Sequence, residues 1–311
     1  MAKVVFTHKP GSRYDDLPEW RYHFPRTYLR QVEAALGDFI VYYEPGRRGP
    51  GDNLREGRKA YFATARLVRI ERDPTRGDHY YAHVEDYLEF LRPVPFREDG
   101  FYYEHRLRKG DGTVNKGAFG RAVRVLDDYE YELICRAGFA EELGMEPPSL
   151  PSVPERMLAE PPAVFARPIV ETLVTRPFRD RAFARAVQGA YGQTCAFTGL
   201  RIINGGGRPE VQAAHIRPVA DQGPDSVRNG IALSATLHWL FDRGLVSIAP
   251  DHGILVAERQ IPERLLSLLN PDRRIRLPSD PRLRPAPAFL EYHRRRVFKG
   301  SSTSTSRRRI R

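Results

Sequence analysis

The sequence has few cysteines and no long apolar run. Only Cys135 and Cys195 occur among 311 residues, which excludes a disulfide scaffold and fits a reducing compartment. No apolar stretch approaches the length needed to cross a bilayer, and the opening MAKVVFTHKPGS lacks the apolar centre of a secretion signal. We therefore expect a cytoplasmic protein that has no membrane partner.

Acidic residues are also outnumbered. Lys and Arg total 50 against 39 Asp and Glu, which gives a formal net charge of +11 and a pI near 9.8. This excess favours a polyanionic partner. Most of the positive charge is arginine, which suits contacts with phosphate and guanine. A hydrophobic content of 41% in 311 residues is enough for two packed domains.

The residues that most clearly indicate a chemical function lie between positions 195 and 242. An alternating apolar stretch, a polar loop with Pro and Gly, and a segment of helical spacing follow one another there, at 211–216, 217–228 and 233–241. His215 belongs to the predicted strand. Helical residues four positions apart share one face, so His238 and Asp242 can offer a ring nitrogen and a carboxylate to the same metal ion.

These residues resemble the motif of the HNH nucleases, the ββα-metal family of phosphodiesterases. The three motif positions match His215, Asn229 and His238, and the flanking Ala-His-Ile, Asn-Gly and Leu-His-x-Leu-Phe-Asp resemble the restriction-type subgroup. The resemblance implies that His215 is the general base, that Asn229 orients it, and that His238 and Asp242 bind Mg²⁺ or Mn²⁺. In-line attack on a phosphodiester needs such a base together with a cation.

The sequence departs from the HNH pattern at two places. Many HNH enzymes have a metal-binding Asp or His before the base, but here that residue is Ala214, and Glu210 or a substrate phosphate oxygen are the alternatives for the missing ligand. Many HNH domains also carry Cys-x-x-Cys pairs around a zinc ion. Cys195 is followed by Thr198 and by no later cysteine, so we expect no structural zinc.

The first part of the chain predicts several strands and few helices, which indicates a small curved sheet or barrel. A predicted helix at 26–36 leads through Gly37-Asp38 into a strand at 39–43, and Tyr-His-Phe-Pro and Ala-Tyr-Phe-Ala-Thr-Ala-Arg occur at 22–25 and 60–66. These features resemble the PUA-like superfamily, in particular EVE-type modules fused to HNH nucleases. The resemblance, which extends to SRA-type readers, implies that a flipped, modified base is captured in an aromatic pocket.

Capture of a base requires rings that stack on it and polar groups that read its edge. The predicted modified-base residues are Tyr14, Asp15, Trp20, Tyr22, Phe24 and Tyr43. Trp20 and Tyr22 are the preferred stacking pair, because residues two positions apart lie on the same face of a strand. Asp15 is the predicted acceptor for a cytosine amino group. Arg47, Arg48 and Arg217 are predicted to contact the DNA backbone.

The sequence predicts an α+β protein of two domains. We expect a PUA-like reader domain, a proline-rich linker, an HNH nuclease domain and a basic flexible tail, at residues 1–143, 144–168, 169–298 and 299–311. The predicted function is restriction of double-stranded DNA that carries a modified base, a modified cytosine such as 5-methylcytosine or 5-hydroxymethylcytosine, by a homodimer. The alternatives are an HNH nuclease specific for unmodified DNA sequence or structure, and an inactive nucleic-acid-binding protein.

Overall fold

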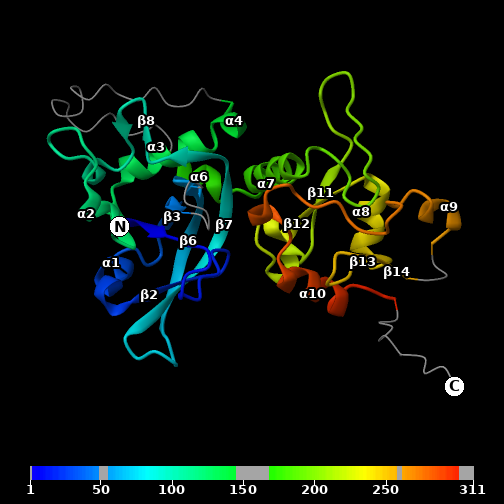
Figure 1. Ribbon diagram of the computed structural model, residues 1–311, viewed down its shortest axis with the longest axis horizontal. Helices are drawn as coiled ribbons and strands as arrows, with labels where there is room; N and C mark the ends of the chain where they lie inside the picture. The colour runs from blue at the N-terminus through cyan, green and yellow to red at the C-terminus, as the bar shows by residue number, and fades with distance from the viewer. Residues whose placement is uncertain (1, 49–54, 145–167, 258–260, 301–311) are drawn as a thin grey trace. The chain divides into compact units, whose positions relative to one another are not determined.

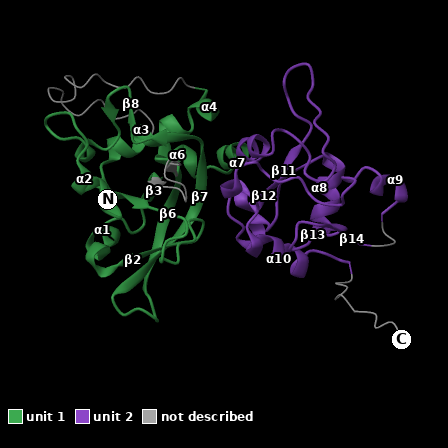
Figure 2. Cartoon of the chain, in the orientation of Figure 1, with its two compact units in different colours: residues 1–182 green, residues 183–311 purple. Residues whose placement is uncertain are grey.

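The computed structural model describes residues 2–48, 55–144, 168–257 and 261–300 (Figure 1). The chain forms two compact units, Met1–Ala182 and Phe183–Arg311, which are coloured separately in Figure 2. Both units mix helices with strands, so the α+β prediction is confirmed. Within the described ranges, no helix has the length and apolar character that a membrane crossing requires.

Unit 1 is organised around one six-stranded sheet with the order β10-β1-β3-β6-β7-β2. β1 and β3 run parallel, and the other neighbours are antiparallel. The strands are β1 (Lys3–Thr7), β2 (Arg21–Pro25), β3 (Phe39–Glu44), β6 (Ala60–Arg72), β7 (His79–Pro95) and β10 (Val123–Leu126). The long β6 and β7 shift register at three places, and such irregularities increase local twist and let a sheet curl.

Apolar side chains cover both faces of this sheet. On β1, Val5 belongs to a core that includes residues of α3 (Asp128–Gly138), whereas Val4 and Phe6 belong to a second core that includes Val32 of α1 (Leu29–Glu33). Successive strand residues point to opposite faces. The unbroken burial of β1 and β3 therefore follows from apolar layers on both sides.

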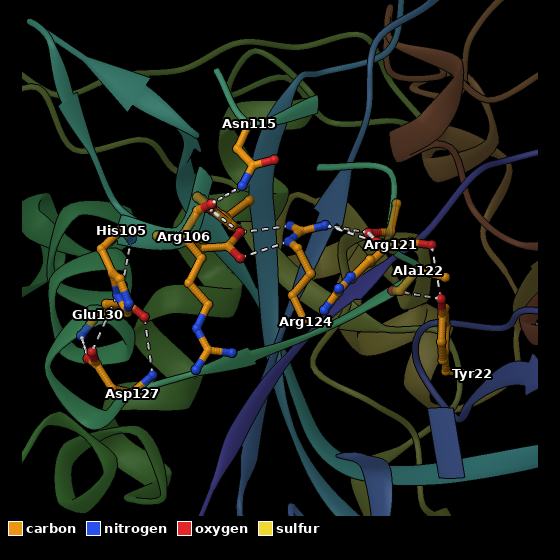
Figure 3. Close-up of polar contacts among 12 residues, drawn as sticks. Tyr22, His105, Arg106, Asn115, Arg121, Ala122, Arg124, Asp127 and Glu130 are labelled. Carbon is orange, nitrogen blue, oxygen red and sulfur yellow. Dashed lines mark hydrogen bonds and ion pairs between the residues drawn. The ribbon is translucent and has the colours of Figure 1, made fainter. Parts of the chain in front are cut away.

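A buried ion pair ties β10 to Glu104, which precedes α2 (Lys116–Phe119). Arg124 donates two hydrogen bonds to Glu104, each 2.7 Å long, and Tyr61 donates to the same carboxylate at 2.6 Å. Arg124 also donates to the Arg121 carbonyl (Figure 3). A buried charge is tolerated when its partners are satisfied in this way, and the pKa of Arg124 is raised by Glu104 despite the opposing effect of burial.

The remaining elements of unit 1 are short. They are β4 (Arg47–Arg48), β5 (Arg55–Glu56), β8 (Arg97–Glu98), β9 (Phe101–Tyr102), α2 (Lys116–Phe119), α4 (Ala140–Leu143) and α6 (Ile169–Leu173). The predicted linker lies almost wholly outside the described residues, as does most of the predicted tail. The structure places α6 in unit 1, because Ile169 and Leu173 are buried in the same core as α3.

The division between the units falls inside a helix. We expected the nuclease domain to start at residue 169, but the units divide between Ala182 and Phe183, within α7 (Arg176–Ala190). The first half of α7 contributes Phe178 and Ala182 to the core of unit 1. Sequence periodicity does not reveal which core each turn of such a helix joins.

Unit 2 contains a ββα arrangement followed by a hairpin and a final helix. Its elements are β11 (Gln212–His215), β12 (Gly230–Leu233), α8 (Ala235–Asp242), β13 (Val246–Ile248), β14 (Ile254–Val256), α9 (Glu263–Leu266) and α10 (Pro287–Arg296). β11 and β12 pair antiparallel, with His215 opposite Gly230. The strand, loop and helix expected between 211 and 242 are thus present, with ends shifted by one or two residues.

Candidate active site

Two side chains hold the ring of His215. Phe183 of α7 stacks on it with ring centroids 3.9 Å apart and planes inclined by 11°. The His215 Nε2 donates to Asp225 Oδ1 at 2.9 Å, and the Asp225 carboxylate is only 3% exposed. A carboxylate that accepts from one ring nitrogen fixes the tautomer and leaves the other nitrogen as the proton acceptor. That nitrogen, Nδ1, makes no hydrogen bond within the described part of the chain.

The close approach of α7 to this strand depends on Gly230. A Cβ at this position would lie 2.3 Å from Cγ2 of Val187 and 3.1 Å from the Phe183 ring. Such distances are well inside van der Waals contact. The glycine of the Asn-Gly pair therefore makes room for the helix that supports the His215 ring.

Asn229 closes the loop between the two strands. Its side-chain Nδ2 donates to the carbonyl oxygens of Arg217 and Pro224, each at 3.0 Å, and its Oδ1 accepts from the Arg217 backbone N–H at 2.9 Å. The side chain is fully buried. Because three bonds tie it to both ends of the loop, Asn229 fixes the path of the chain that carries Asp225 to His215.

His238 and Asp242 lie one turn apart on α8. His238 Nε2 and Asp242 Oδ2 are 3.4 Å apart, and two ligands that each lie about 2.1 Å from one Mg²⁺ can be at most about 4.2 Å apart. His238 Nδ1 donates to Gln212 Oε1 at 2.8 Å. A second hydrogen bond of this kind usually orients a metal-binding histidine, so the donor set fits a divalent ion.

The structure places Ala214 in the core and gives Glu210 a contact at the start of α8. Ala214 is fully buried opposite Ile231, on the face of β11 away from His215. A carboxylate at this position would point into the core. In the structure, Glu210 Oε1 accepts from the Ala235 N–H at 3.0 Å and so caps the start of α8. An acid is favourable at a helix N-terminus.

Three of the four predicted catalytic and metal residues share one cavity, and the fourth, Asn229, is buried outside its lining. A hollow of about 300 Å³ is lined by His215, His238 and Asp242 and by neighbours on β11 and α10. His293 also borders it but is a buried core residue that stacks on Phe241 and bonds Ser247 and the Phe241 carbonyl. Burial lowers its pKa from 6.5 to about 4, so His293 is neutral near pH 7.

Comparison with known proteins supports this geometry. The sequence matches a protein-family model described as HNH endonuclease over residues 195–249. Residues 195–249 are an HNH endonuclease domain. The HNH domain therefore covers β11, β12, α8 and β13, and the predicted family resemblance of this region is confirmed. The ring that supports His215, Phe183, lies outside the matched range.

Two solved structures match large parts of the chain. One is described as the modification dependent TagI restriction endonuclease, with 15% identity over 94% of this chain and 81% of that chain, and a TM-score of 0.30. The other is the type IV phosphorothioation-dependent restriction endonuclease ScoMcrA, with 14% identity, coverage of 76% and 52%, and a TM-score of 0.19. Neither superposition is close. No curated protein is recognisably similar in sequence.

The structure corrects half of the predicted base pocket. Tyr22 and Phe24 are buried in the core that contains Phe6, where Tyr22 stacks on Phe6 with centroids 4.3 Å apart and donates to the Ala122 carbonyl (Figure 3). Tyr43 is buried in the core on the other face of the sheet. These three rings pack the core, and Tyr43 cannot share a pocket with the other two.

The other three predicted pocket residues are accessible. Tyr14 and Trp20 are partly exposed, and Asp15 is exposed and pairs with Arg21. Tyr14 lies near the rings of His23 and His79, with centroids 5.6 and 5.9 Å away. Trp20 and Tyr22 therefore do not form an exposed pair, and the rings near Tyr14 are the buried His23 and the partly buried His79.

The structure describes the side chain of only one of the three arginines predicted to contact the DNA backbone. The side chains of Arg47 and Arg48 lie outside the described residues. Arg217 donates to the Asp221 carbonyl at 2.7 Å and lies over the ring of Tyr292, 5.0 Å from its centroid. Its backbone N–H donates to Asn229 Oδ1, and Arg217 follows the predicted base, His215, by two residues.

A second group of possible metal ligands lies in unit 1. His105, Asp127 and Glu130 have ligand atoms within 4.8 Å of one another, and Figure 3 shows the three side chains side by side. Asp127 and Glu130 form a capping box at the start of α3, and Glu130 also accepts from the backbone N–H and Nδ1 of His105. These contacts explain the cluster, because its side chains cap the N-terminus of α3.

Proposed function

We propose that this chain is a metal-dependent DNA endonuclease directed to modified DNA by its N-terminal unit. The observation that supports cleavage is the shared cavity of His215, His238 and Asp242 within the HNH domain. The basic charge of +11 suits a DNA partner. Both similar solved structures are described as modification- or phosphorothioation-dependent restriction enzymes.

In the proposed reaction, His215 removes a proton from water. Asp225 holds Nε2 of the ring, so Nδ1 is the atom that accepts the proton while the oxygen attacks phosphorus in line. Asn229 maintains the loop, and Phe183 prevents the ring from turning. His238 and Asp242 would hold a divalent ion, Mg²⁺ or Mn²⁺. Such an ion offsets the negative charge that develops on the phosphate and the leaving oxygen.

We assign the reading of the modified base to unit 1. Its curled sheet is consistent with the PUA-like resemblance, and Tyr14, Asp15 and Trp20 lie at its surface. The proposed substrate is double-stranded DNA with a modified cytosine. One HNH site cuts one strand, so we propose that two copies of the chain act together on a duplex.

The experiment compares plasmids that carry 5-methylcytosine, 5-hydroxymethylcytosine or neither, each with Mg²⁺, Mn²⁺ or a chelator. We expect cleavage only with a metal and mainly of modified plasmid, and none by the His215→Ala variant. Equal cleavage of all three plasmids would support recognition of unmodified DNA. Binding without cleavage under every metal condition would indicate an inactive nucleic-acid-binding protein.

A further inference from the structure

An ordered loop precedes β11 and lies outside the catalytic cavity. Ile203 bridges to Pro209, and the Asn204 N–H donates to the Arg208 carbonyl at 3.0 Å. The Asn204 side chain accepts from the backbone N–H groups of Gly206 and Arg208 at 3.0 and 2.9 Å. We call residues 203–209 the turn loop. It belongs to the yellow-green part of the chain in Figure 1, and these bonds give it a defined shape.

A second cavity, of about 450 Å³, lies between the turn loop, α7 and the start of β11. Its polar lining consists of Gln188, Asn204, Arg208, Glu210 and Gln212. Arginine pairs with guanine, Asn and Gln pair with adenine, and Glu accepts from the cytosine amino group. The cavity thus collects the side chains that read base edges in the major groove.

Several of these side chains are held in place at one end. Gln188 donates to the Val211 carbonyl at 2.7 Å, and Gln212 accepts from His238 at 2.8 Å. Arg208 differs, because its exposed guanidinium makes no hydrogen bond or ion pair to any residue that the structure describes. A fixed polar lining beside an arginine available for pairing is a suitable arrangement for recognition.

The charge of the lining favours a base edge over a phosphate. The Glu210 carboxylate lies in the same cavity as Arg208, and it would repel a phosphate group brought close to it. A guanine edge presents two neutral acceptors, O6 and N7, which match the two parallel N–H groups of an arginine.

The distance between this cavity and His215 relates the cavity to the position of DNA cleavage. Gln212 and His215 are three residues apart on β11, which corresponds to about 10 Å of strand. B-DNA advances 3.4 Å per nucleotide along its axis, so about three base pairs fit that distance. Resting on the proposed function, we propose that Arg208 reads a guanine about three base pairs from the scissile phosphate, which gives the nuclease unit a sequence preference of its own.

The experiment uses modified plasmids that carry random bases around each modified site. The full chain cleaves them, and the DNA ends that it produces are sequenced. For the parent, we expect guanine to be enriched at one position near the cut by about fivefold or more. Arg208→Ala should remove that enrichment while preserving the preference for modified over plain plasmid. Arg208→Lys should not restore it, because lysine lacks the planar pair of donors.

Arg201→Ala is the matched control. Arg201 is exposed and close in sequence, but its guanidinium donates to the Gly192 carbonyl and the Gln193 side chain and does not line the cavity. It should retain the guanine enrichment. A thermal melt of each variant checks folding.

Three results would overturn the inference. The first is that the DNA ends cut by the parent show no base preference. The second is that the guanine enrichment persists in Arg208→Ala. The third is that Arg208→Ala loses cleavage equally for all sequences and Arg208→Lys restores it. The last pattern would identify a phosphate contact. A parent that cuts no DNA at all would instead contradict the proposed nuclease function.

Discussion

At the scale of the residue, the proposed base depends on neighbours that are distant in sequence. Phe183 and Asp225 approach His215 from α7 and from the loop between the strands. The ring is therefore restrained on one face and at one nitrogen. This arrangement orients the ring for the proton transfer that we propose.

Substitution of His215 should separate cleavage from binding. His215→Ala removes the group that accepts the proton of water, so we expect turnover to fall about 10²- to 10⁴-fold with little change in DNA affinity. His252→Ala, in the turn between β13 and β14, serves as the histidine control. Rates from plasmid nicking and affinities from gel shifts check the two quantities. A loss of affinity with normal turnover would show that His215 binds DNA rather than catalyses.

Asp225→Asn tests the positioning of that base. An amide cannot hold the same tautomer as a carboxylate, so we expect turnover to fall about 10²-fold or more while KM changes little. Asp225→Glu should recover part of the lost turnover. A matched rise in KM, or a lowered melting temperature that explains the loss, would indicate a structural role alone.

His293 makes the stability of unit 2 depend on pH. Burial lowers its pKa to about 4, so the unfolded chain binds a proton before the folded chain as the pH falls. Stability is therefore present above about pH 6.5 and is lost progressively toward pH 4, by about 3 kcal/mol. Urea unfolding of the parent and of His293→Gln at pH 7 and 4.5 checks this. The variant should lose less stability between the two pH values than the parent.

At the scale of the element, α8 is both a structural and a chemical unit. Its first turn is capped by Glu210, and its exposed face carries His238 and Asp242 one turn apart. The spacing of these two ligands is set by helix geometry alone. Their orientation also needs Gln212, which comes from the paired strand.

The metal requirement should change when either α8 ligand is removed. We expect His238→Ala and Asp242→Ala to raise the Mg²⁺ or Mn²⁺ concentration for half-maximal cleavage by about tenfold or more, because one ligand of the ion is lost. Thr236→Ala, exposed on the same helix, should leave it unchanged. Cleavage measured over a metal titration tests this. If neither ligand variant shifts the requirement, the ion is bound elsewhere.

Gly230→Ala tests the contact between β12 and α7. The added methyl group would meet Val187 at 2.3 Å, and overpacking of this kind costs about 1 to 3 kcal/mol. Because the same contact positions Phe183, cleavage should fall as well. Chemical denaturation and nicking rates measure both effects. Gly205→Ala, which has open space around it, is the control, and equal behaviour of the two variants would contradict the expectation.

The elements differ in how far sequence could predict them. His215, Asn229 and His238 could be predicted because they belong to a local motif that resembles the HNH nucleases, and the structure brings His215 and His238 to one cavity. Phe183, Asp225 and Gln212 were missed because tertiary packing brings them to the site. The base pocket failed for a related reason. Tyr22 and Tyr43 lie on opposite faces of a sheet that is buried on both sides, and in such a sheet alternation cannot distinguish a pocket from a core.

At the scale of the whole molecule, two units with separate cores suggest separate tasks. Unit 1 contains the accessible Tyr14 and Trp20, and unit 2 contains the HNH domain. In this proposal, changes in unit 1 alter the choice of DNA and changes in unit 2 alter the cut. A variant that affects only one of these properties would support the division.

Trp20→Ala is the test of this separation. Loss of a stacking ring costs about 1 to 3 kcal/mol, so the preference for modified over plain DNA should fall about fivefold or more. Residual cutting should persist at low salt and decline steeply as salt rises, since phosphate contacts do not depend on the base. Trp239→Ala, in unit 2 and 57% exposed, can change the rate but should keep the preference.

Cleavage of both plasmids at two salt concentrations measures the effect, after circular dichroism has shown that the variants are folded. If Trp20→Ala keeps the full preference, Trp20 does not contact the base. If variants of Tyr14 and Asp15 also keep it, unit 1 is not the reader.

The position of Phe183 has a practical consequence for engineering chimaeras from this protein. The matched HNH segment starts at Cys195. A fusion that begins there would lack the Phe183 ring, which stacks on His215, and the Val187 side chain, which packs against Gly230. A cut at 183 would keep the ring but begin the fragment in the middle of a helix whose earlier turns belong to the other core. A transplantable nuclease should therefore begin before Arg176, with Phe178 replaced by a polar residue.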